Sequence, residues 1–158
     1  MRKPKIYLET TLFNYFFDTD RDAHPDTVKL FKDVAAGKYE AYTSQHVIEE
    51  LKKADEPKRG NMLAMIPEYG ITVLEFSDAA DRLADIYIAA GIIPPHKRMD
   101  ALHIAITAVN NLDMIFSLNF RHIVKARTIL ETEKINHSHG LNAIELNSPM
   151  GVEEDEKA

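Results

Sequence analysis

The sequence contains no cysteine among its 158 residues. This absence excludes disulfide bonds and thiolate metal sites, and it suits a protein of a reducing compartment. No apolar run approaches the ~18 residues that a membrane-spanning helix needs. Near the N-terminus, Glu9, Asn14 and Asp18 interrupt the apolar segment, so that segment does not resemble the core of a signal peptide. We therefore expect a cytoplasmic protein that does not enter a membrane.

The chain also lacks a glycine-rich phosphate-binding loop and any residue order that indicates a Ser-His-Asp triad. Its formal net charge is −6, but four of the acids lie in the last eight residues, 151–158. The other 150 residues carry 18 basic and 21 acidic side chains. This mildly acidic balance does not favour nucleic-acid binding through overall charge, although it allows a local basic patch.

Length and composition predict one folded domain. A chain of this length, with 45% apolar residues, is typical of a globular domain with its own core. We expect this domain to span residues 1–150 and the acidic tail, residues 151–158, to be disordered.

Short apolar segments alternate with amphipathic segments along the whole chain. Strands are expected at residues 5–10, 39–44, 71–76, 114–117 and 143–146. Helices are expected near residues 12–17, 24–37, 45–54, 59–66, 77–91, 99–111 and 121–134. Thr10 or Thr11 is expected to cap the first helix and Ser44 the third. The alternation predicts an α/β fold, a three-layer α/β/α sandwich with a mainly parallel central sheet.

Polar side chains follow several of the predicted strands. Glu9 ends the first strand, Asn119 lies just past the fourth, and Glu49 and Glu50 occupy the helix after the second. Asp100 opens the most apolar helix of the chain. Because ligand sites in parallel α/β folds lie beyond the carboxyl ends of the strands, we expect these side chains to meet at one edge of the sheet.

Carboxylates that meet repel one another, so at least one takes up a proton unless a cation compensates them. Hard oxygen ligands suit Mg²⁺ or Mn²⁺, and a metal-bound water can attack a phosphodiester. Each residue also has a simpler role. Asp100 can be a helix N-cap, Glu49 and Glu50 can be solvated helix residues, and Asn119 can be a turn former. The set as a whole, rather than any one member, predicts a metal site.

Four segments, in this order, resemble a PIN domain of the VapC toxin type. They are KIYLETTLFNYFF (5–17), TSQHVIEEL (43–51), MDALHIAITAVNNLDMIFSLNFRHI (99–123) and AIELNSP (143–149). The resemblance implies a compact α/β endoribonuclease that uses Mg²⁺ or Mn²⁺. It also implies an RNA substrate, an antitoxin protein as partner and a homodimer. The aromatic residues of LFNYFF can serve either that dimer or the core.

The resemblance assigns catalytic positions to Glu9, Glu50, Asp100 and Asn119, and makes the first three the metal ligands, with Glu49 as the alternative to Glu50. Two departures stand out, because Glu9 occupies a position that is normally Asp and Asn119 carries no charge. They leave open a second function, in which a PIN-like domain binds RNA or a protein partner without cleavage.

Basic side chains flank three of the four predicted site positions, despite the negative total charge. Such a rim is what a phosphate backbone needs when it enters an acidic site. We predict that Arg121, Arg98 and Ser117, which fills the hydroxyl position of the family, contact the substrate. His103 lies one turn after Asp100. It is expected either to lean toward the site or to be a hydrogen-bonded residue of the core.

Overall fold

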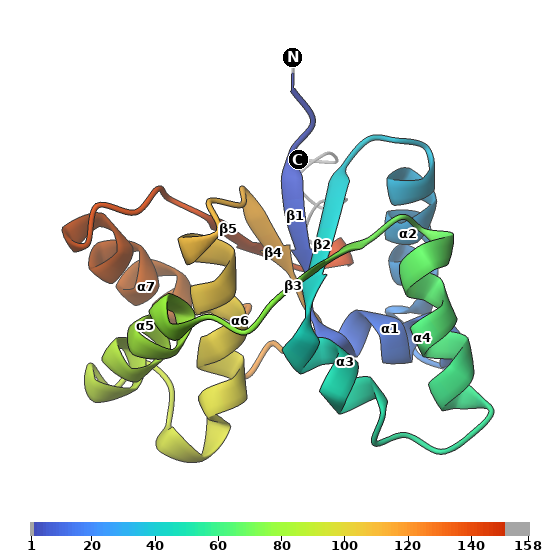
Figure 1. The fold of residues 1–158 in the computed structure, drawn as a ribbon, viewed down its shortest axis with the longest axis horizontal. Coiled ribbons are helices and arrows are strands. Elements are labelled where there is room, and N and C mark those ends of the chain that lie inside the picture. The colour runs from blue at the N-terminus through green and yellow to red at the C-terminus, as the bar shows by residue number, and fades with distance from the viewer. Residues whose placement is uncertain (1, 151–158) are drawn as a thin grey trace.

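A five-stranded sheet in which every strand pairing is parallel organises the fold (Figure 1). The computed structural model describes residues 2–150. The strands follow the order β3-β2-β1-β4-β5 across the sheet, and their bounds are Lys5–Leu8 (β1), Glu40–Ser44 (β2), Thr72–Leu74 (β3), Met114–Phe116 (β4) and Glu145–Asn147 (β5). Strand β1 is central, and its residues Ile6, Tyr7 and Leu8 are fully buried, as expected for a strand covered on both faces.

Helices cover both faces of this sheet. Figure 1 shows one group, α1 (Thr10–Phe17), α2 (His24–Ala35) and α4 (Lys58–Glu68), on one side. The other group is α5 (Asp78–Ala89), α6 (Arg98–Val109) and α7 (Ala126–Ser138). The short helix α3 (Gln45–Leu51) follows β2 directly, and a 3-10 turn, η1 (Pro95–Lys97), leads into α6. The predicted three-layer sandwich with a parallel sheet is confirmed.

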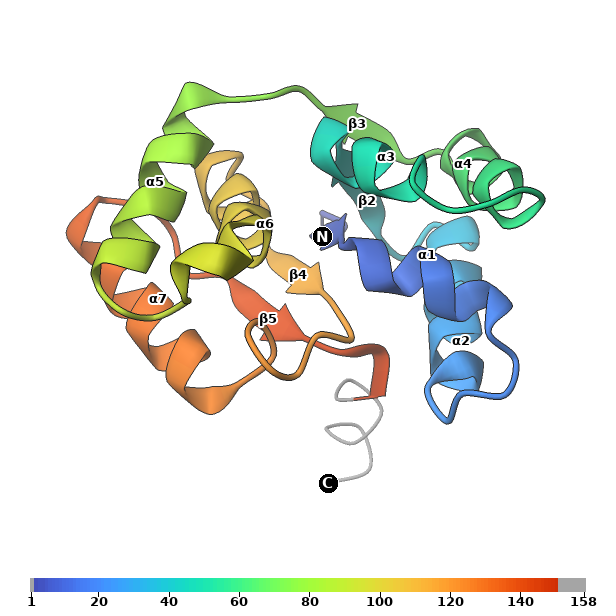
Figure 2. The ribbon, with the colours of Figure 1, turned by 90° about the horizontal axis from the view of Figure 1, so that it is seen from below.

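Helix α6 is buried along almost its whole length, from Ala101 to Ala108. It packs closely against α5 and against β4. The turn η1 leads into α6, and Asp100 lies in the first turn of this helix. That turn lies at the carboxyl ends of the strands (Figure 2). This placement brings an acidic residue to the carboxyl edge of the sheet on an otherwise apolar helix.

The expected cap of the first helix is wrong, and the alternative role of Asp100 as an N-cap is not observed. Neither Thr10 nor Thr11 caps α1, because Glu9 occupies the N-cap position and its carboxylate accepts a hydrogen bond from the Thr11 amide. Asp100 is not an N-cap either, because Lys97 holds that position and Asp100 lies in the first turn. The cap by Ser44 is confirmed, since its hydroxyl accepts from the Val47 amide.

Other boundaries differ from the predictions by a few residues. Helix α7 begins at Ala126 rather than near residue 121, because Asn119 turns the chain first, its side-chain oxygen accepting from the Arg121 and His122 amides. The expected disordered tail, residues 151–158, lies outside the described residues. In the described part of the chain, none of the helices combines the length and the apolar character that crossing a bilayer requires.

Asp113 ties the sheet together at the opposite edge, where the strands begin. Its carboxylate receives two hydrogen bonds from the Arg2 guanidinium, at 2.9 and 2.8 Å, and one from the Lys5 amide at 2.7 Å. Its backbone amide donates to the Lys5 carbonyl, and its carbonyl accepts from Glu145. The residue therefore links the starts of β1, β4 and β5.

Replacement of Asp113 by alanine should destabilise the protein in a pH-dependent way. The hydrogen bonds from Arg2, together with its charge and the Lys5 amide, outweigh desolvation and lower the pKa of Asp113. The stabilisation is therefore present above the unfolded-state pKa and is lost as the pH falls through the lowered folded-state pKa. We expect a loss of about 1 kcal/mol near neutral pH from the Lys5 amide bond, since the exposed Arg2 pair adds little.

Urea unfolding of wild type and Asp113→Ala from neutral to acid pH measures this difference. Asp20→Ala, at an exposed position in the α1–α2 loop, is the control and should match the wild type at every pH. A difference between wild type and Asp113→Ala that does not shrink in acid would contradict the linkage.

Candidate active site

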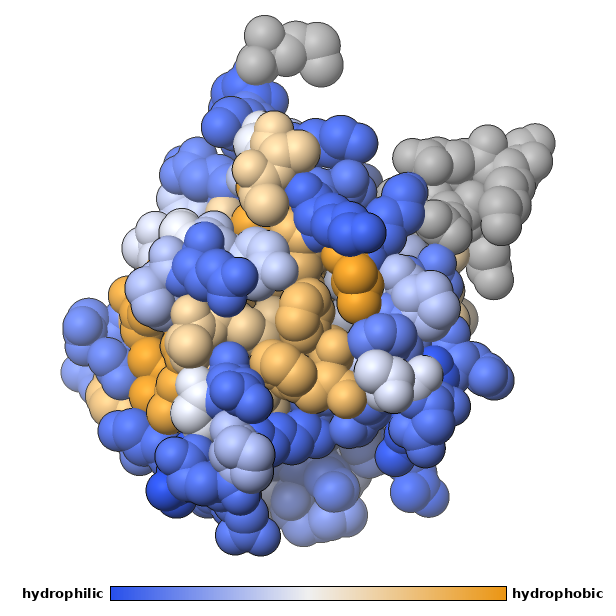
Figure 3. Space-filling view, turned by 90° about the vertical axis from the view of Figure 1, so that its right-hand side faces the viewer, coloured by the Kyte–Doolittle hydropathy of each residue, from blue (hydrophilic) through white to orange (hydrophobic). Residues whose placement is uncertain are grey.

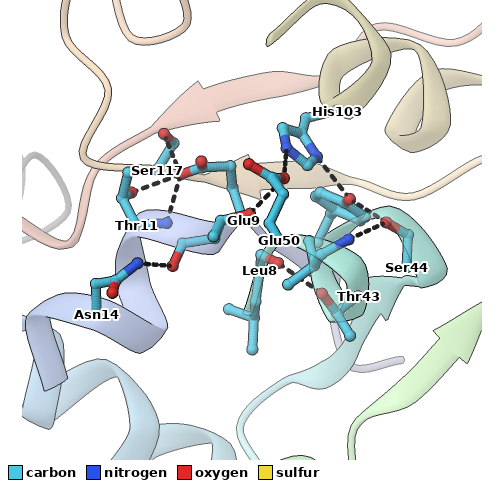
Figure 4. A network of polar contacts seen from close by, with 12 residues as sticks. Leu8, Glu9, Thr11, Asn14, Thr43, Ser44, Glu50, His103 and Ser117 are labelled. Carbon is cyan, nitrogen blue, oxygen red and sulfur yellow. Dashed lines mark hydrogen bonds and ion pairs between the residues drawn. The ribbon is translucent and has the colours of Figure 1, made fainter. Parts of the chain in front are cut away.

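The carboxylate of Glu9 is the most buried acidic group of the candidate site, with 4% of the residue exposed. Three donors converge on its Oε1 atom: the amide and the hydroxyl of Thr11, and the hydroxyl of Ser117 at 2.8 Å (Figure 4). No donor of the described chain contacts Oε2. Burial raises the pKa of Glu9, although the charge of His103 and these hydrogen bonds act in the opposite direction. Glu9 is thus held in one orientation, with one oxygen still available.

Glu50 lies beside Glu9 and is held by two other donors. Its Oε1 atom accepts from the Thr10 hydroxyl at 2.7 Å and lies 3.0 Å from Nε2 of His103 (Figure 4). Desolvation raises the pKa of Glu50, but the hydrogen bond and the charge of His103 outweigh it, so the net pKa is lowered. Glu49 instead is exposed and pairs with Lys52. Of the two candidate positions on α3, Glu50 is the one that faces the other acids.

His103 connects the acids to the core of the sheet. It is almost fully buried, and its Nδ1 lies 2.8 Å from the Tyr7 hydroxyl, which in turn lies 2.7 Å from the Ser44 hydroxyl. Burial lowers the pKa of His103, but the hydrogen bond to Glu50 and the negative charges of Glu9, Glu50 and Asp100 outweigh it, so its pKa is raised. His103 is both a hydrogen-bonded core residue and part of the site, and the three acids act together on this one ring.

Asp100 supplies the third acid from the first turn of α6. Its Oδ2 atom is buried and has no hydrogen-bond partner among the described residues. A buried carboxylate oxygen without a donor is costly unless a cation meets it. This orphaned atom and the hard oxygen donors of Glu9 and Glu50 fit Mg²⁺ or Mn²⁺ by their chemistry. Within residues 2–150, however, no three acidic or histidine side chains lie close enough together to form a complete metal site.

The remaining predicted residues lie around this cluster in different settings. Asn119 turns the chain after β4 and is partly exposed, and Arg121 is exposed two residues later. Ser117 is fully buried, and its hydroxyl donates to Glu9 and accepts from the Asn119 amide. Arg98 forms ion pairs with the Asp81 and Asp85 side chains of α5. The substrate contacts predicted for Ser117, Arg98 and Arg121 remain predictions.

Four hydroxyl groups that the sequence pattern does not point to also belong to the site, those of Tyr7, Thr10, Thr11 and Ser44. They hold Glu9, Glu50 and His103 in place through the hydrogen bonds described above. The one available signal is the pair of threonines after Glu9. Thr10 reaches Glu50 and Thr11 reaches Glu9, so each hydroxyl serves a different acid.

Comparisons with known proteins place this geometry in a known fold. No family model and no curated protein matches the sequence. Two solved structures match the fold with a TM-score of 0.56 each. VapC20 of Mycobacterium tuberculosis, a Sarcin-Ricin loop cleaving toxin, is 16% identical and covers 70% of this chain and 86% of its own. VapBC2 of Rickettsia felis, bound to a DNA fragment from its promoter, is 17% identical and covers 90% of this chain and 98% of the matched one. The chain therefore has the fold of VapC PIN-domain toxins, as its sequence resemblance predicts.

Removal of the Ser117 hydroxyl should destabilise the protein through Glu9. Ser117→Ala leaves a buried carboxylate with one donor fewer and the Asn119 amide without its acceptor, a loss of about 1–3 kcal/mol. Ser138→Ala removes an exposed hydroxyl of α7 and should change the free energy of unfolding by less than about 0.5 kcal/mol. Urea unfolding measures both, and equal losses for the two variants would show that Glu9 does not depend on Ser117.

Proposed function

We propose that this protein is a metal-dependent endoribonuclease whose active site is formed by Glu9, Glu50, Asp100 and Asn119. The observation that carries the proposal is the Asp100 Oδ2 atom, which is buried and has no hydrogen-bond partner among the described residues, close to a His103 ring that contacts Glu50 and whose pKa is raised by the charges of Glu9, Glu50 and Asp100. The shared fold with a toxin that cleaves the Sarcin-Ricin loop supports RNA as the substrate.

Glu9, Glu50 and Asp100 would hold Mg²⁺ or Mn²⁺. When bound, this ion lowers the pKa of a water molecule and stabilises the negative charge that develops on the phosphate. Glu9 offers the oxygen that its three donors leave unused, and Asp100 offers its orphaned oxygen. His103 keeps Glu50 oriented and offsets the repulsion among the acids.

Asn119 and Arg121 act on the substrate side of the site. The Asn119 side-chain oxygen is engaged with two backbone amides, so its amide nitrogen is the group that orients a water molecule or a phosphate oxygen. Arg121 and Lys53 are exposed, and Lys53 follows Glu50 by three residues. The charge of Lys53 lowers the pKa of Glu50. These cations give a phosphate backbone a route to an otherwise acidic site.

A second function is favoured by one observation, that the three carboxylates do not form a complete metal site in this structure. In that case the domain binds RNA or a protein partner without cleaving it. Calorimetric titration with Mn²⁺ separates the two functions. A metal site that is present in the wild type and absent from Asp100→Asn counts against binding without cleavage.

The toxin of a toxin–antitoxin pair is the biological role that fits this site. The acidic cluster would accept a basic side chain from an antitoxin protein, because an Arg or Lys satisfies buried carboxylates as a cation does. The fold it shares with the VapBC2 structure, which is bound to promoter DNA, supports such a partner.

We further propose a homodimer formed through the face that carries α2 and α4. Figure 3 shows a continuous apolar patch on this side of the molecule. Phe13 is buried in the core. Four other apolar side chains on this side are only partly buried: Phe16 of α1, Leu63 and Ile66 of α4, and Tyr69, which follows α4. A patch of this kind is typical of a protein–protein interface. Sedimentation velocity should show a dimer, and a monomer at every concentration would contradict this interface.

Asp100→Asn should abolish RNA cleavage and leave the protein folded. The substitution keeps the size of the side chain but removes the charge that the cation needs, so we expect a loss of at least about a hundredfold. The assay is cleavage of a mixed RNA pool with Mn²⁺, with EDTA as the blank. Asp113→Asn, at the opposite edge of the sheet, is the matched control and should cut like the wild type. Cleavage retained by Asp100→Asn would refute the assigned site.

A further inference from the structure

Three large hydrophobic side chains are exposed within residues 2–150: Phe76 (60%), Leu130 (58%) and Phe120 (48%). Leu130 lies on α7, but both phenylalanines follow strand ends, Phe76 after β3 and Phe120 after β4. Both therefore lie at the carboxyl edge of the sheet, where the acids converge. In the sheet β3 and β4 lie on opposite sides of β1, and Figure 2 shows the connections that carry the two residues, β3–α5 and β4–α7, well apart from each other.

Phe76 contacts His46, a residue of the same helix as Glu50. The two rings are 4.7 Å apart between centroids and meet at 81°, edge to face. His46 lies in the first turn of α3, one turn before Glu50, so the two side chains share a face of that helix. An edge-to-face contact covers at most one face of the Phe76 ring, so the other face stays open. Only His46 separates this ring from Glu50 along the face of α3.

Phe120 lies between a predicted catalytic residue and a cation. The Asn119 side chain accepts hydrogen bonds from the Arg121 and His122 amides, and these bonds fix the turn that presents Phe120. Arg121 is exposed, and its side chain has no partner in the part of the chain that the structure describes. Phe120 and Arg121 are neighbours in the sequence, so this exposed turn carries one aromatic surface for a base and one guanidinium for a phosphate.

We propose that Phe76 and Phe120 are stacking platforms for two unpaired bases of a single-stranded RNA, one on each side of the acidic cluster. This inference rests on the proposed function and narrows its substrate to single-stranded RNA or a loop. Bases paired inside a duplex have no face to offer, so these rings select against duplex RNA.

The chemistry of the surroundings favours RNA over a protein as the occupant. The centre of a protein interface is depleted of charged residues, whereas these two rings are separated by buried and half-buried carboxylates. Single-strand binding sites combine isolated aromatic rings with cations that follow the backbone, and here Lys53 and Arg121 supply the cations. Stacking also tolerates any base, so the two rings distinguish single-stranded from double-stranded RNA rather than one base sequence from another.

Binding of a fluorescein-labelled single-stranded RNA oligonucleotide, followed by anisotropy in the Asp100→Asn background, tests the proposal without cleavage. Phe76→Ala and Phe120→Ala should each weaken binding by about tenfold. Phe76→Tyr and Phe120→Tyr should restore it, because a phenol ring stacks as well. Leu130→Ala, which removes the third exposed hydrophobic side chain, should bind like the parent protein.

The absence of tryptophan gives a second, direct readout. Phe76→Trp and Phe120→Trp each introduce the only indole of the protein, and its fluorescence should be quenched by the single-stranded oligonucleotide. The same RNA annealed into a duplex, or heparin as a charge-only probe, should leave the fluorescence unchanged. Quenching that appears with heparin would overturn stacking as its cause.

Binding by both alanine variants that equals the parent protein would overturn the inference, as would an absence of RNA binding by the wild type. A failure of the proposed nuclease activity can be distinguished from a failure of the stacking proposal. If Asp100→Asn cuts RNA as the wild type does, the metal site is wrong while the stacking measurements stand. If Asp100→Asn alone is inactive and the alanine variants bind and cut normally, only the platforms are wrong.

Discussion

The hydrogen bonds on the buried Glu9 carboxylate are the interaction on which the rest of the site depends. Glu9 ends the central strand and begins α1, so its position is set by the core of the sheet. A carboxylate this deep is costly, and the Thr11 and Ser117 donors offset the cost at a single oxygen. Because Ser117 follows β4 directly, these bonds also align the ends of two neighbouring strands. The residue that we propose as a metal ligand is therefore also one that links two strands of the sheet.

The need of these carboxylates for hydrogen-bonding partners also explains why His103 lies among the acids. Helix α6 is apolar, and its first turn brings Asp100 to the strand ends without a cap or a partner for Oδ2. One turn later, His103 reaches Glu50 on one side and Tyr7 on the other. The ring thus joins α6 to α3 and β1, and the raised pKa of His103 favours a positive charge among the three acids. A cluster of this kind favours a ligand of positive charge, whether a divalent ion or a basic side chain.

The sheet and its order of elements followed from the sequence because apolar strands and amphipathic helices alternate with clear periodicity. Glu9 was proposed as a site residue because it follows a strand, and Asp100 because it is an acid at the start of an otherwise apolar helix. What the pattern did not reveal was the set of hydroxyl groups that orient them. Thr10 and Thr11 were expected to serve the backbone of α1 as caps, but their partners are Glu50, 40 positions away, and Glu9. Such long-range pairings depend on tertiary packing and leave no periodic signal.

We propose that Glu9, Glu50 and Asp100 form one cation site. Crystals of the wild type soaked with Mn²⁺ test it most directly, because manganese gives an anomalous signal that locates the ion independently of any assay. We expect one ion in contact with Asp100 and within ligand distance of Glu9 or Glu50. Saturating Mn²⁺ that leaves no anomalous peak at these carboxylates, with the unpartnered Asp100 oxygen unchanged, would contradict it.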